Sequence, residues 1–325
     1  TNVTTSTSPT SVNVADPDQV PNDSTYHQTA IANGTDRDVS NYAQLQTAWE
    51  NSSVTDINIT KDSNITTGTL ANRANGASVI INGNNHAIDI GGQTFTYAAA
   101  TTQTNFTLSN ITVKQGFLWN DGNGYSLISS LAATQLTANI NNVTLTKSDV
   151  NGYNPIHVMY GIGSKINFSG TNTFNLSNEV TRSVGSINFA NNASVTLNRT
   201  SNDIHFSEFY FETTAPVGSV GYGNTLTMGD GSSNAAYTYN GVSAGFPAVY
   251  LLINGITAGD NVSWTQTGFQ YFINGTQLAN SSAQYTFGQN FTLNAPSTTQ
   301  AGAISLLGTQ KATFNAGTVF NIHQR

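Results

Sequence analysis

Short runs of alternating apolar and polar residues recur along the chain, and each run is bounded by Asn or Gly. Examples are VTDINIT, NFTLSNITV, LTANINNVTL, SKINFSGTNTFNL and GSINFANNASVTL. Strict alternation predicts strands with one buried face, and clusters of Asn and Gly predict the turns between them. The pattern therefore predicts an all-β protein built from many short strands.

The runs repeat with spacers of unequal length. The matched pairs, at offsets of 21, 32 or 31 residues, are Ile166 with Ile187, Phe168 with Phe189, Leu176 with Leu197, Ile111 with Val143, and Val143 with Phe174. A constant strand pattern with variable spacers is typical of a β-solenoid, whose rungs stack and extrude insertions as loops. A β-sandwich, with longer hairpin strands and tight turns, is the alternative that we favour less.

One segment near the N-terminus has helical periodicity. In RDVSNYAQLQTAWENSS, Leu45, Ala48 and Trp49 fall on one helical face, and Ser40 or Asn41 can cap the helix. We expect this short helix to plug the end of the stack; a helix packed on a sandwich is the alternative. Residues 1–35 lack periodicity and are expected to form an extended arm or linker, followed by a solenoid over residues 36–325.

Charge and cysteine content exclude several classes of site. The chain has 10 Lys and Arg against 17 Asp and Glu, which gives a net charge of −7 and disfavours nucleic-acid binding at neutral pH. It has no Cys, so disulfides and thiolate metal sites are excluded. Its longest apolar run, 248–253, is too short to cross a bilayer. The sequence starts without a basic and apolar leader, and we expect it to be a piece of a longer precursor.

Three segments carry a resemblance to a known family. They are VSNYAQLQTAWENSSVTDINITKDSNIT, VIINGNNHAIDI and FTLSNITVKQ, within residues 38–116. This region resembles the binding region of serine-rich repeat adhesins from lactobacilli, whose fold is similar to the right-handed parallel β-helix of pectate lyases. The resemblance implies a secreted module displayed on the bacterial cell surface, attached through regions outside this sequence, that binds mucin or acidic polysaccharide.

The sequence contains no recognisable pattern of catalytic residues. A pectate lyase needs carboxylates that converge on calcium and a basic residue that removes a proton, but the acidic residues are scattered and no RxPxxR pattern surrounds Arg182 or Arg199. Glu208 and Glu212 form the closest pair, and such pairs serve in glycosidases, although solvated carboxylates are the alternative. The five His residues lack metal-ligand spacing. We therefore expect a non-catalytic module with no cofactor and no metal; a polysaccharide lyase on the same fold is the alternative.

The most promising ligand contacts lie in the insertions. Trp119 stands beside Asn120, Asp121 and Gly122 in the stretch 117–125, where an aromatic ring can stack on a sugar. Tyr125 is a second candidate, although it closes an NGY triplet that recurs later and that suits a structural role equally well. Tyr160, Lys165 and Arg182 are expected on adjacent insertions.

The repeat alignment also stacks Gln115, Lys147, Asn178 and Arg199 just beyond one strand. With rungs roughly 4.8 Å apart, this stack predicts a polar track whose cations meet sugar carboxylates. An ordinary solvated edge is the alternative.

These observations predict a partner class and a pH response. We expect the module, monomeric and without membrane insertion, to bind host mucin glycoproteins or acidic polysaccharides such as polygalacturonate. Long-range repulsion opposes such binding at pH 7, because both partners are negative. Binding is therefore expected to strengthen toward acidic pH, where the net charge changes sign near the pI of about 5.0.

Overall fold

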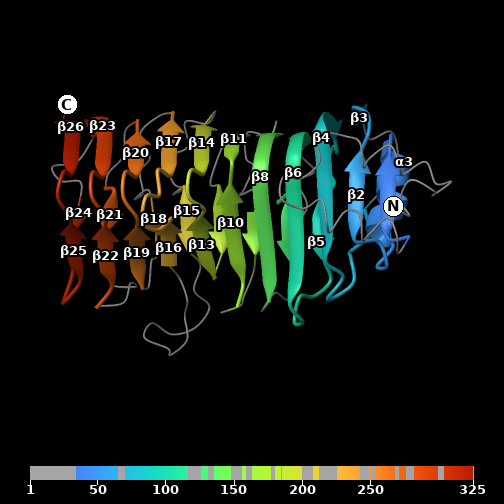
Figure 1. The fold of residues 1–325 in the computed structure, drawn as a ribbon, viewed down its shortest axis with the longest axis horizontal. Helices are drawn as coiled ribbons and strands as arrows, with labels where there is room; N and C mark the ends of the chain where they lie inside the picture. Colours follow the sequence, from blue (N-terminus) through green and yellow to red (C-terminus); the bar gives the residue numbers. More distant parts are fainter. Residues whose placement is uncertain are drawn as a thin grey trace.

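The structure is a computed structural model in which the chain coils into a stack of parallel rungs (Figure 1). It describes residues 34–64, 70–115, 126–130, 135–147, 156–158, 163–176, 180–183, 185–199, 208–211, 225–241, 249–250, 254–267, 271–275, 282–298 and 304–324. Every strand pairing within these residues is parallel, so the prediction of a parallel β-solenoid is confirmed and the sandwich alternative is wrong.

The strands of the described residues form two sheets. The large, 18-stranded sheet contains β1 (Asp36–Val39), β2 (Asp56–Ile59), β3 (Ser63–Asn64), β4 (Val79–Asp89), β6 (Thr104–Gln115), β8 (Leu136–Lys147), β10 (Lys165–Ser169), β11 (Thr171–Leu176), β13 (Ser186–Phe189), β14 (Ser194–Arg199), β16 (Thr225–Met228), β17 (Ala236–Asn240), β19 (Gly255–Ala258), β20 (Ser263–Gln266), β22 (Gln284–Phe287), β23 (Thr292–Thr298), β25 (Lys311–Phe314) and β26 (Val319–Gln324). The 8-stranded sheet, named here the short-strand sheet, contains β5 (Phe95–Tyr97), β7 (Ile128–Ser130), β9 (Ile156–Val158), β12 (Thr181–Ser183), β15 (Phe209–Phe211), β18 (Val249–Tyr250), β21 (Ile273–Asn274) and β24 (Ile304–Ser305).

A left-handed residue sits at one corner of the large sheet in rung after rung. The corner residues have φ between 52° and 81°, and they are Asn110, Asn142, Gly170, Asn192, Asn234, Asn261, Asn290 and Gly317. Most L-residues lose about 1–2 kcal/mol in this conformation, whereas Gly is unaffected and Asn is tolerated. The Asn and Gly that bound each alternating run in the sequence therefore mark the bend between two halves of a rung.

The corner asparagines also bond to one another. Asn142 donates its side-chain N–H to Asn110 Oδ1 at 3.1 Å, Asn234 donates to Asn192, and Asn290 donates to Asn261. The backbone N–H of Thr171 donates to Asn142 Oδ1 at 2.9 Å, across to the next rung. The corner thus fixes the direction of the chain and joins successive rungs.

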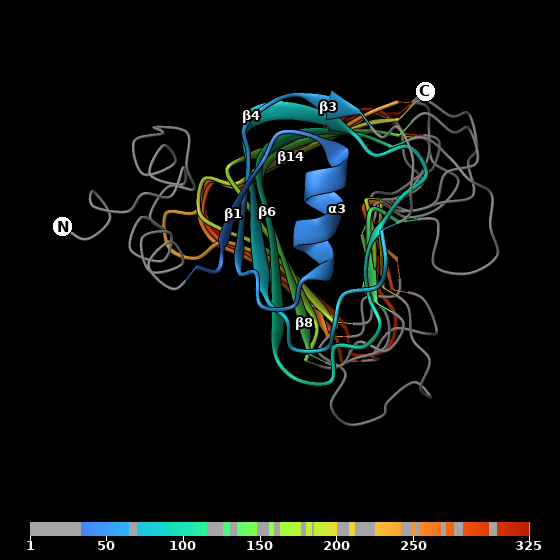
Figure 2. The same ribbon diagram turned by 90° about the vertical axis from the view of Figure 1, so that its right-hand side faces the viewer.

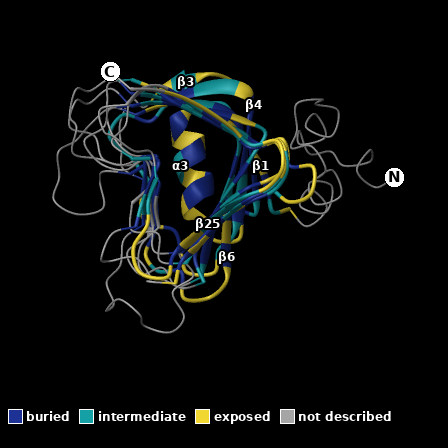
Figure 3. Ribbon diagram, turned by 90° about the vertical axis from the view of Figure 1, so that its left-hand side faces the viewer, coloured by how far each residue is buried: buried dark blue, intermediate teal, exposed yellow. Residues whose placement is uncertain are grey.

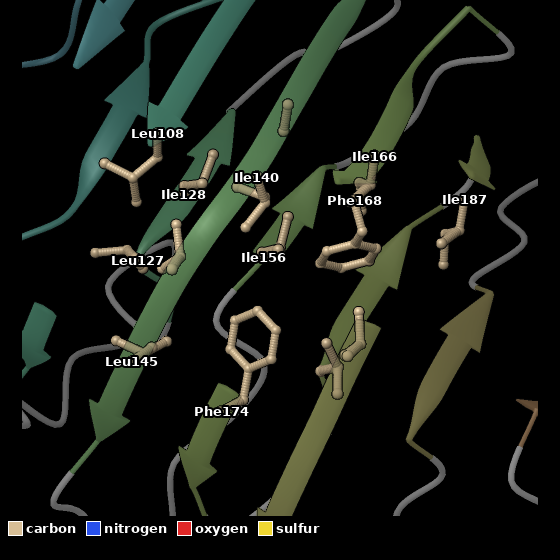
Figure 4. Close-up of a cluster of buried hydrophobic side chains, with 14 of the residues drawn as sticks. Leu108, Leu127, Ile128, Ile140, Leu145, Ile156, Ile166, Phe168, Phe174 and Ile187 are labelled. Carbon is tan, nitrogen blue, oxygen red and sulfur yellow. The ribbon is translucent and has the colours of Figure 1, made fainter. Parts of the chain in front are cut away.

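Inward-facing apolar side chains fill the space between the two sheets (Figure 4). In β8, Ile140, Val143 and Leu145 are at most 1% exposed. Further along the stack an aromatic chain takes over, with ring centroids 4.9 Å apart for Phe209 and Tyr237 and 4.4 Å apart for Tyr237 and Trp264. Edge-to-face and tilted pairs of this kind add to the free energy of area burial.

Helix α3 (Tyr42–Glu50) closes the N-terminal end of the stack (Figure 2). Asn41 caps the helix by accepting the backbone N–H of Gln44 at 2.9 Å, as the sequence predicted. Trp49 is fully buried, with its ring centroid 5.1 Å from that of Phe95. Arg73 lies over the Trp49 ring and donates to the Trp49 carbonyl oxygen at 2.5 Å, so a buried guanidinium fastens the cap to the first rungs.

The C-terminal end is built differently. Phe320 and Ile322 occupy the inward positions of β26, in register with Leu293 and Ala295 of β23. Both are exposed, at 44% and 38%, whereas Leu293 and Ala295 are 0% exposed (Figure 3). The last described rung therefore presents its apolar edge without the cover that each earlier rung receives from the next.

The observed register corrects two of the five sequence matches. Ile166 pairs with Ile187 and Phe168 with Phe189 as expected, and Ile111 pairs with Val143. Phe174, however, pairs with Leu145 rather than Val143, and with Leu197 on its other side. The matches of Val143 with Phe174 and of Leu176 with Leu197 are therefore wrong by two positions.

The length of the corner explains the wrong match of Leu176 with Leu197. One residue, Gly170, separates β10 from β11, whereas residues 190–193 separate β13 from β14. Because side chains alternate with a period of two, a slip of two positions keeps every residue on its face and leaves the sequence pattern unchanged. Alternation alone could not detect it.

We predict that Gly170→Ala destabilises the protein by about 2 kcal/mol more than Gly231→Ala. Both glycines have positive φ, but a Cβ at Gly231 meets nothing within 4 Å, whereas a Cβ at Gly170 would overlap Asn142 Oδ1. Moving that oxygen breaks its bond with the Thr171 N–H. Urea unfolding of the two variants measures the difference, and equal losses would contradict the proposed role of the corner.

Candidate ligand-binding surface

The insertions that the sequence singled out connect the large sheet to the short-strand sheet. Residues 116–127 join β6 to β7, and residues 148–155 join β8 to β9. Figure 2 shows the short-strand sheet across the stack from the large sheet. Trp119 and Tyr125 belong to the first of these connections, and Tyr160 belongs to the connection from β9 to β10; all three lie outside the described residues.

The short-strand sheet places one residue per rung in a single column. One residue from each of six successive strands is paired in register with the next, namely Thr96, Ser129, His157, Arg182, Tyr210 and Tyr250. In β15 the flanking Phe209 and Phe211 are buried while Tyr210 is half-buried, so Tyr210 alternates with two core residues. This column brings Arg182 into line with His157 and Tyr210, which the sequence did not reveal because its strands are only three residues long.

The N-terminal end of the column is covered. Thr96 and Ser129 are 6% and 0% exposed, and their hydroxyl oxygens are 2.8 Å apart. The half-buried Tyr210 marks a more accessible part of the same column.

Lys147 and Arg199 do not form a surface track. Lys147 is the last residue of β8 and is 3% exposed, and Arg199 ends β14 and is 8% exposed. Gln115 pairs with Lys147 as expected, but it is 1% exposed. Arg199 lies in register with Leu176, an inward-facing core residue, and not with Asn178, which falls outside the described residues. The strands extend to these positions, so alternation directs the side chains inward, and the expected solvated polar track is wrong.

The expectation that Lys165 and Arg182 lie on insertions is wrong, because Lys165 belongs to β10 and Arg182 to β12. Lys165 is the first residue of β10, exposed, and in register with Thr137 and Ser186. Lys165 belongs to the large sheet, whereas Arg182 belongs to the short-strand sheet. The two residues therefore lie in different sheets of the stack.

Glu208 is not a solvated edge carboxylate. It is 2% exposed, and the Tyr237 hydroxyl donates to its Oε1 at 3.2 Å. Glu212, the other member of the sequence pair, lies outside the described residues. Because a buried carboxyl cannot reach a polysaccharide at the surface, Glu208 is unsuited to the glycosidase role considered for it.

The described part of the chain holds no group of three or more His, Asp or Glu side chains that could bind a metal ion. It also contains no helix that is both long and apolar enough to span a membrane.

Comparison with known proteins shows what the chain is similar to. Residues 36–160 match a family model described as a putative pectate lyase-like adhesive domain. The first rungs resemble an adhesive domain. A solved structure titled L. reuteri 53608 SRRP superposes with a TM-score of 0.60 and 18% identity, over 87% of this chain and 98% of that one. No curated protein matches the chain.

These matches confirm the resemblance that the N-terminal motifs carried. The adhesive-domain model covers the region where those motifs lie, and the solenoid of the serine-rich repeat protein extends the structural likeness along most of the chain. At 18% identity the second comparison shows a shared fold. The family match describes its domain as adhesive, which suggests a non-enzymatic role for residues 36–160.

We predict that Lys165 reacts with an amine-directed acylating reagent at least about tenfold faster than Lys147, whose reaction requires local opening of the stack. The reason is their exposure, since Lys165 is exposed and Lys147 is 3% exposed. Peptide mass spectrometry after brief labelling of the folded chain measures both rates, and labelling in urea supplies the control. Equal rates in the folded chain would contradict the inward position of Lys147.

Proposed function

We propose that this chain is the glycan-binding module of a bacterial surface adhesin, and that it binds host mucin glycans or acidic polysaccharide without cleaving them. The match of residues 36–160 to an adhesive domain carries this proposal. The structural likeness to a serine-rich repeat protein supports a location on the cell surface. Attachment to the cell wall would come from regions outside this sequence, with the module itself monomeric.

The short-strand sheet and its connections form the proposed binding side. Strands in successive rungs are roughly 4.8 Å apart, so the column through His157, Arg182 and Tyr210 can follow an extended polymer. An Arg suits a sugar carboxylate, and a Tyr suits the apolar face of a sugar ring. Trp119, Tyr125 and Tyr160 are proposed as further contacts, because their connections lead into and out of this sheet.

Lys165 is proposed as a peripheral contact. It is exposed but belongs to the large sheet, so it would meet only a ligand that extends around the rung. Lys147 and Arg199 are left out of the binding surface because both are buried.

Binding is proposed to strengthen as the pH falls. The net charge of −7 at pH 7 opposes the approach of a polyuronate, and the sign of the charge reverses below the pI of about 5.0. Salt should weaken this response, because exposed charges are screened beyond about 8 Å at physiological ionic strength.

We predict at least about threefold stronger retention on immobilised polygalacturonate at pH 4 than at pH 7, because the long-range repulsion is removed. Affinity electrophoresis or column retardation at low salt measures the change, with a neutral glucan as the matched control. Equal retention at the two pH values, or an equal gain on the neutral glucan, would contradict the electrostatic argument.

The immobilised polygalacturonate also tests the competing function. A polysaccharide lyase would release unsaturated uronate, which absorbs in the ultraviolet, when calcium is supplied. Steady release that stops on chelation would replace the adhesin proposal with the lyase, whereas retention without release supports the adhesin.

We predict that Trp119→Ala weakens retention by about tenfold, the equivalent of about 1.4 kcal/mol, if its ring stacks on a sugar. Thr257→Ala is the matched control, since Thr257 is exposed on the large sheet and should leave retention unchanged. Thermal unfolding of both variants should match the parent chain. Unchanged retention of the Trp119 variant would remove this residue from the proposed surface.

A further inference from the structure

A polar cluster lies inside the solenoid, among rings that are otherwise apolar. It is formed by Arg199 of β14, Glu208 directly before β15, Tyr237 and Tyr239 of β17, and Gln266 of β20. Each of the five side chains is at most 8% exposed. The cluster therefore contains residues from three successive rungs, with β14, β17 and β20 in the large sheet and Glu208 beside β15 of the short-strand sheet.

Hydrogen bonds give this cluster a defined order. Tyr237 donates its hydroxyl to Glu208 Oε1 at 3.2 Å, and Arg199 donates to the Tyr239 hydroxyl at 3.5 Å. The indole N–H of Trp264 donates to Gln266 Oε1 at 3.0 Å and so orients that amide. One oxygen of the Glu208 carboxyl thus accepts from Tyr237, whereas the buried Oε2 of Glu208 and the buried Nε2 of Gln266 have no hydrogen-bond partner among the described residues.

The main chain of Glu208 is tied to the previous rung. The Val180 N–H donates to the Glu208 carbonyl oxygen at 2.7 Å, immediately before β12. Thr181 then pairs with Phe209 as β12 and β15 run in parallel. Glu208 therefore stands at the point where β15 joins the short-strand sheet.

The charged form of Glu208 is disfavoured where it lies. Burial raises the pKa of the Glu208 carboxyl to about 7, while Gln266, Tyr237 and the Arg199 guanidinium act in the opposite direction. Burial and the nearby Glu208 carboxyl raise the pKa of Tyr237 as well, so Tyr237 remains a donor near neutrality. The groups that face the carboxyl from the neighbouring strands are thus Arg199, Tyr237, Tyr239 and Gln266.

We propose that Glu208 is a pH-operated latch that holds β15 against its neighbouring rungs when its carboxyl is protonated and loosens it when the carboxyl ionises. The residues on both sides of this strand, 200–207 and 212–224, connect β14 to β15 and β15 to β16. The latch therefore acts at the root of two connections of the short-strand sheet. It does not depend on any ligand.

The direction of the effect follows from linkage. A carboxyl whose pKa is higher in the folded chain than in the unfolded chain, where Glu titrates near 4.3, stabilises the fold at low pH. Its contribution is complete below the unfolded value and is lost as the pH rises through the folded value of about 7. Between the two values, the ratio of folded to unfolded chain falls about tenfold per pH unit from this group alone.

Glu208→Gln tests the latch because it keeps the shape of the protonated acid and cannot ionise. Urea unfolding of the full chain from pH 4.5 to pH 8 should show the parent losing stability relative to this variant by about a hundredfold or more in the folded-to-unfolded ratio. Asp230→Asn, at an exposed position, is the matched control and should follow the parent. A parent and a Glu208→Gln variant with the same pH dependence would overturn the proposal.

Hydrogen exchange locates the effect. At pH 8 the Val180 amide should exchange at least about tenfold faster in the parent than in Glu208→Gln, and at pH 5 the two rates should agree. Comparing variants at one pH removes the intrinsic pH dependence of exchange. Equal protection at pH 8 would show that ionisation leaves β15 in place, and would also overturn the proposal.

Tyr237→Phe provides a second test, which does not depend on how well the Gln variant folds. It removes the donor to Glu208 Oε1, and this donor favours the ionised carboxyl. The pKa of Glu208 in the folded chain should therefore rise. The midpoint of the stability loss should move to higher pH, and the total loss should be larger. An unchanged midpoint would contradict the role of Tyr237. None of these measurements uses a glycan, so the failure of the latch and the failure of the adhesin proposal are distinguishable.

Discussion

Parallel stacking of rungs around a left-handed corner is the constraint on which the rest of this structure depends. Each rung must bend at the same height, or its inward side chains would not meet those of the next rung. Asn and Gly at positive φ provide this bend, and the amide of Asn142 shows how the bend also fixes the register by bonding both Asn110 and Thr171. The corner therefore couples local backbone conformation to long-range pairing.

The low charge of the chain follows from the same geometry. In a parallel in-register stack, each residue lies beside the residue at the same position of the neighbouring rung, so a repeated charge would repel itself along the whole column. Amides and hydroxyls avoid this cost, because an amide is both donor and acceptor. Asn188, Asn167 and Asn139 form such a ladder on the large sheet, each donating to the next at 2.9 and 3.0 Å. The large sheet is thereby stabilised by neutral ladders, and charged side chains are few on the described face.

Some charged side chains are nevertheless buried, and two of them gather in one cluster inside the stack. Arg199, Glu208 and their tyrosine partners bury polar groups amid stacked aromatic rings, and buried charge is tolerated only where such groups are paired. The cluster lies beside the short-strand sheet, whose connections differ most in length from rung to rung. The proposed adhesive side and the proposed latch thus share one sheet, while the large sheet acts as the constant scaffold.

The sequence by itself determined the solenoid, the capping helix and the inward or outward face of most strand residues. These follow from alternation, from helical periodicity around Trp49 and from Asn and Gly at the corners, which are all local properties. The tertiary structure alone decided the register between rungs, because a slip of two positions at the corner before β14 leaves alternation intact. It also decided that Lys147 and Arg199 are buried, since their position depends on where β8 and β14 end. The column through Arg182 and Tyr210, and the burial of Glu208, arise from contacts between rungs far apart in sequence, for which a single chain carries no periodic signal.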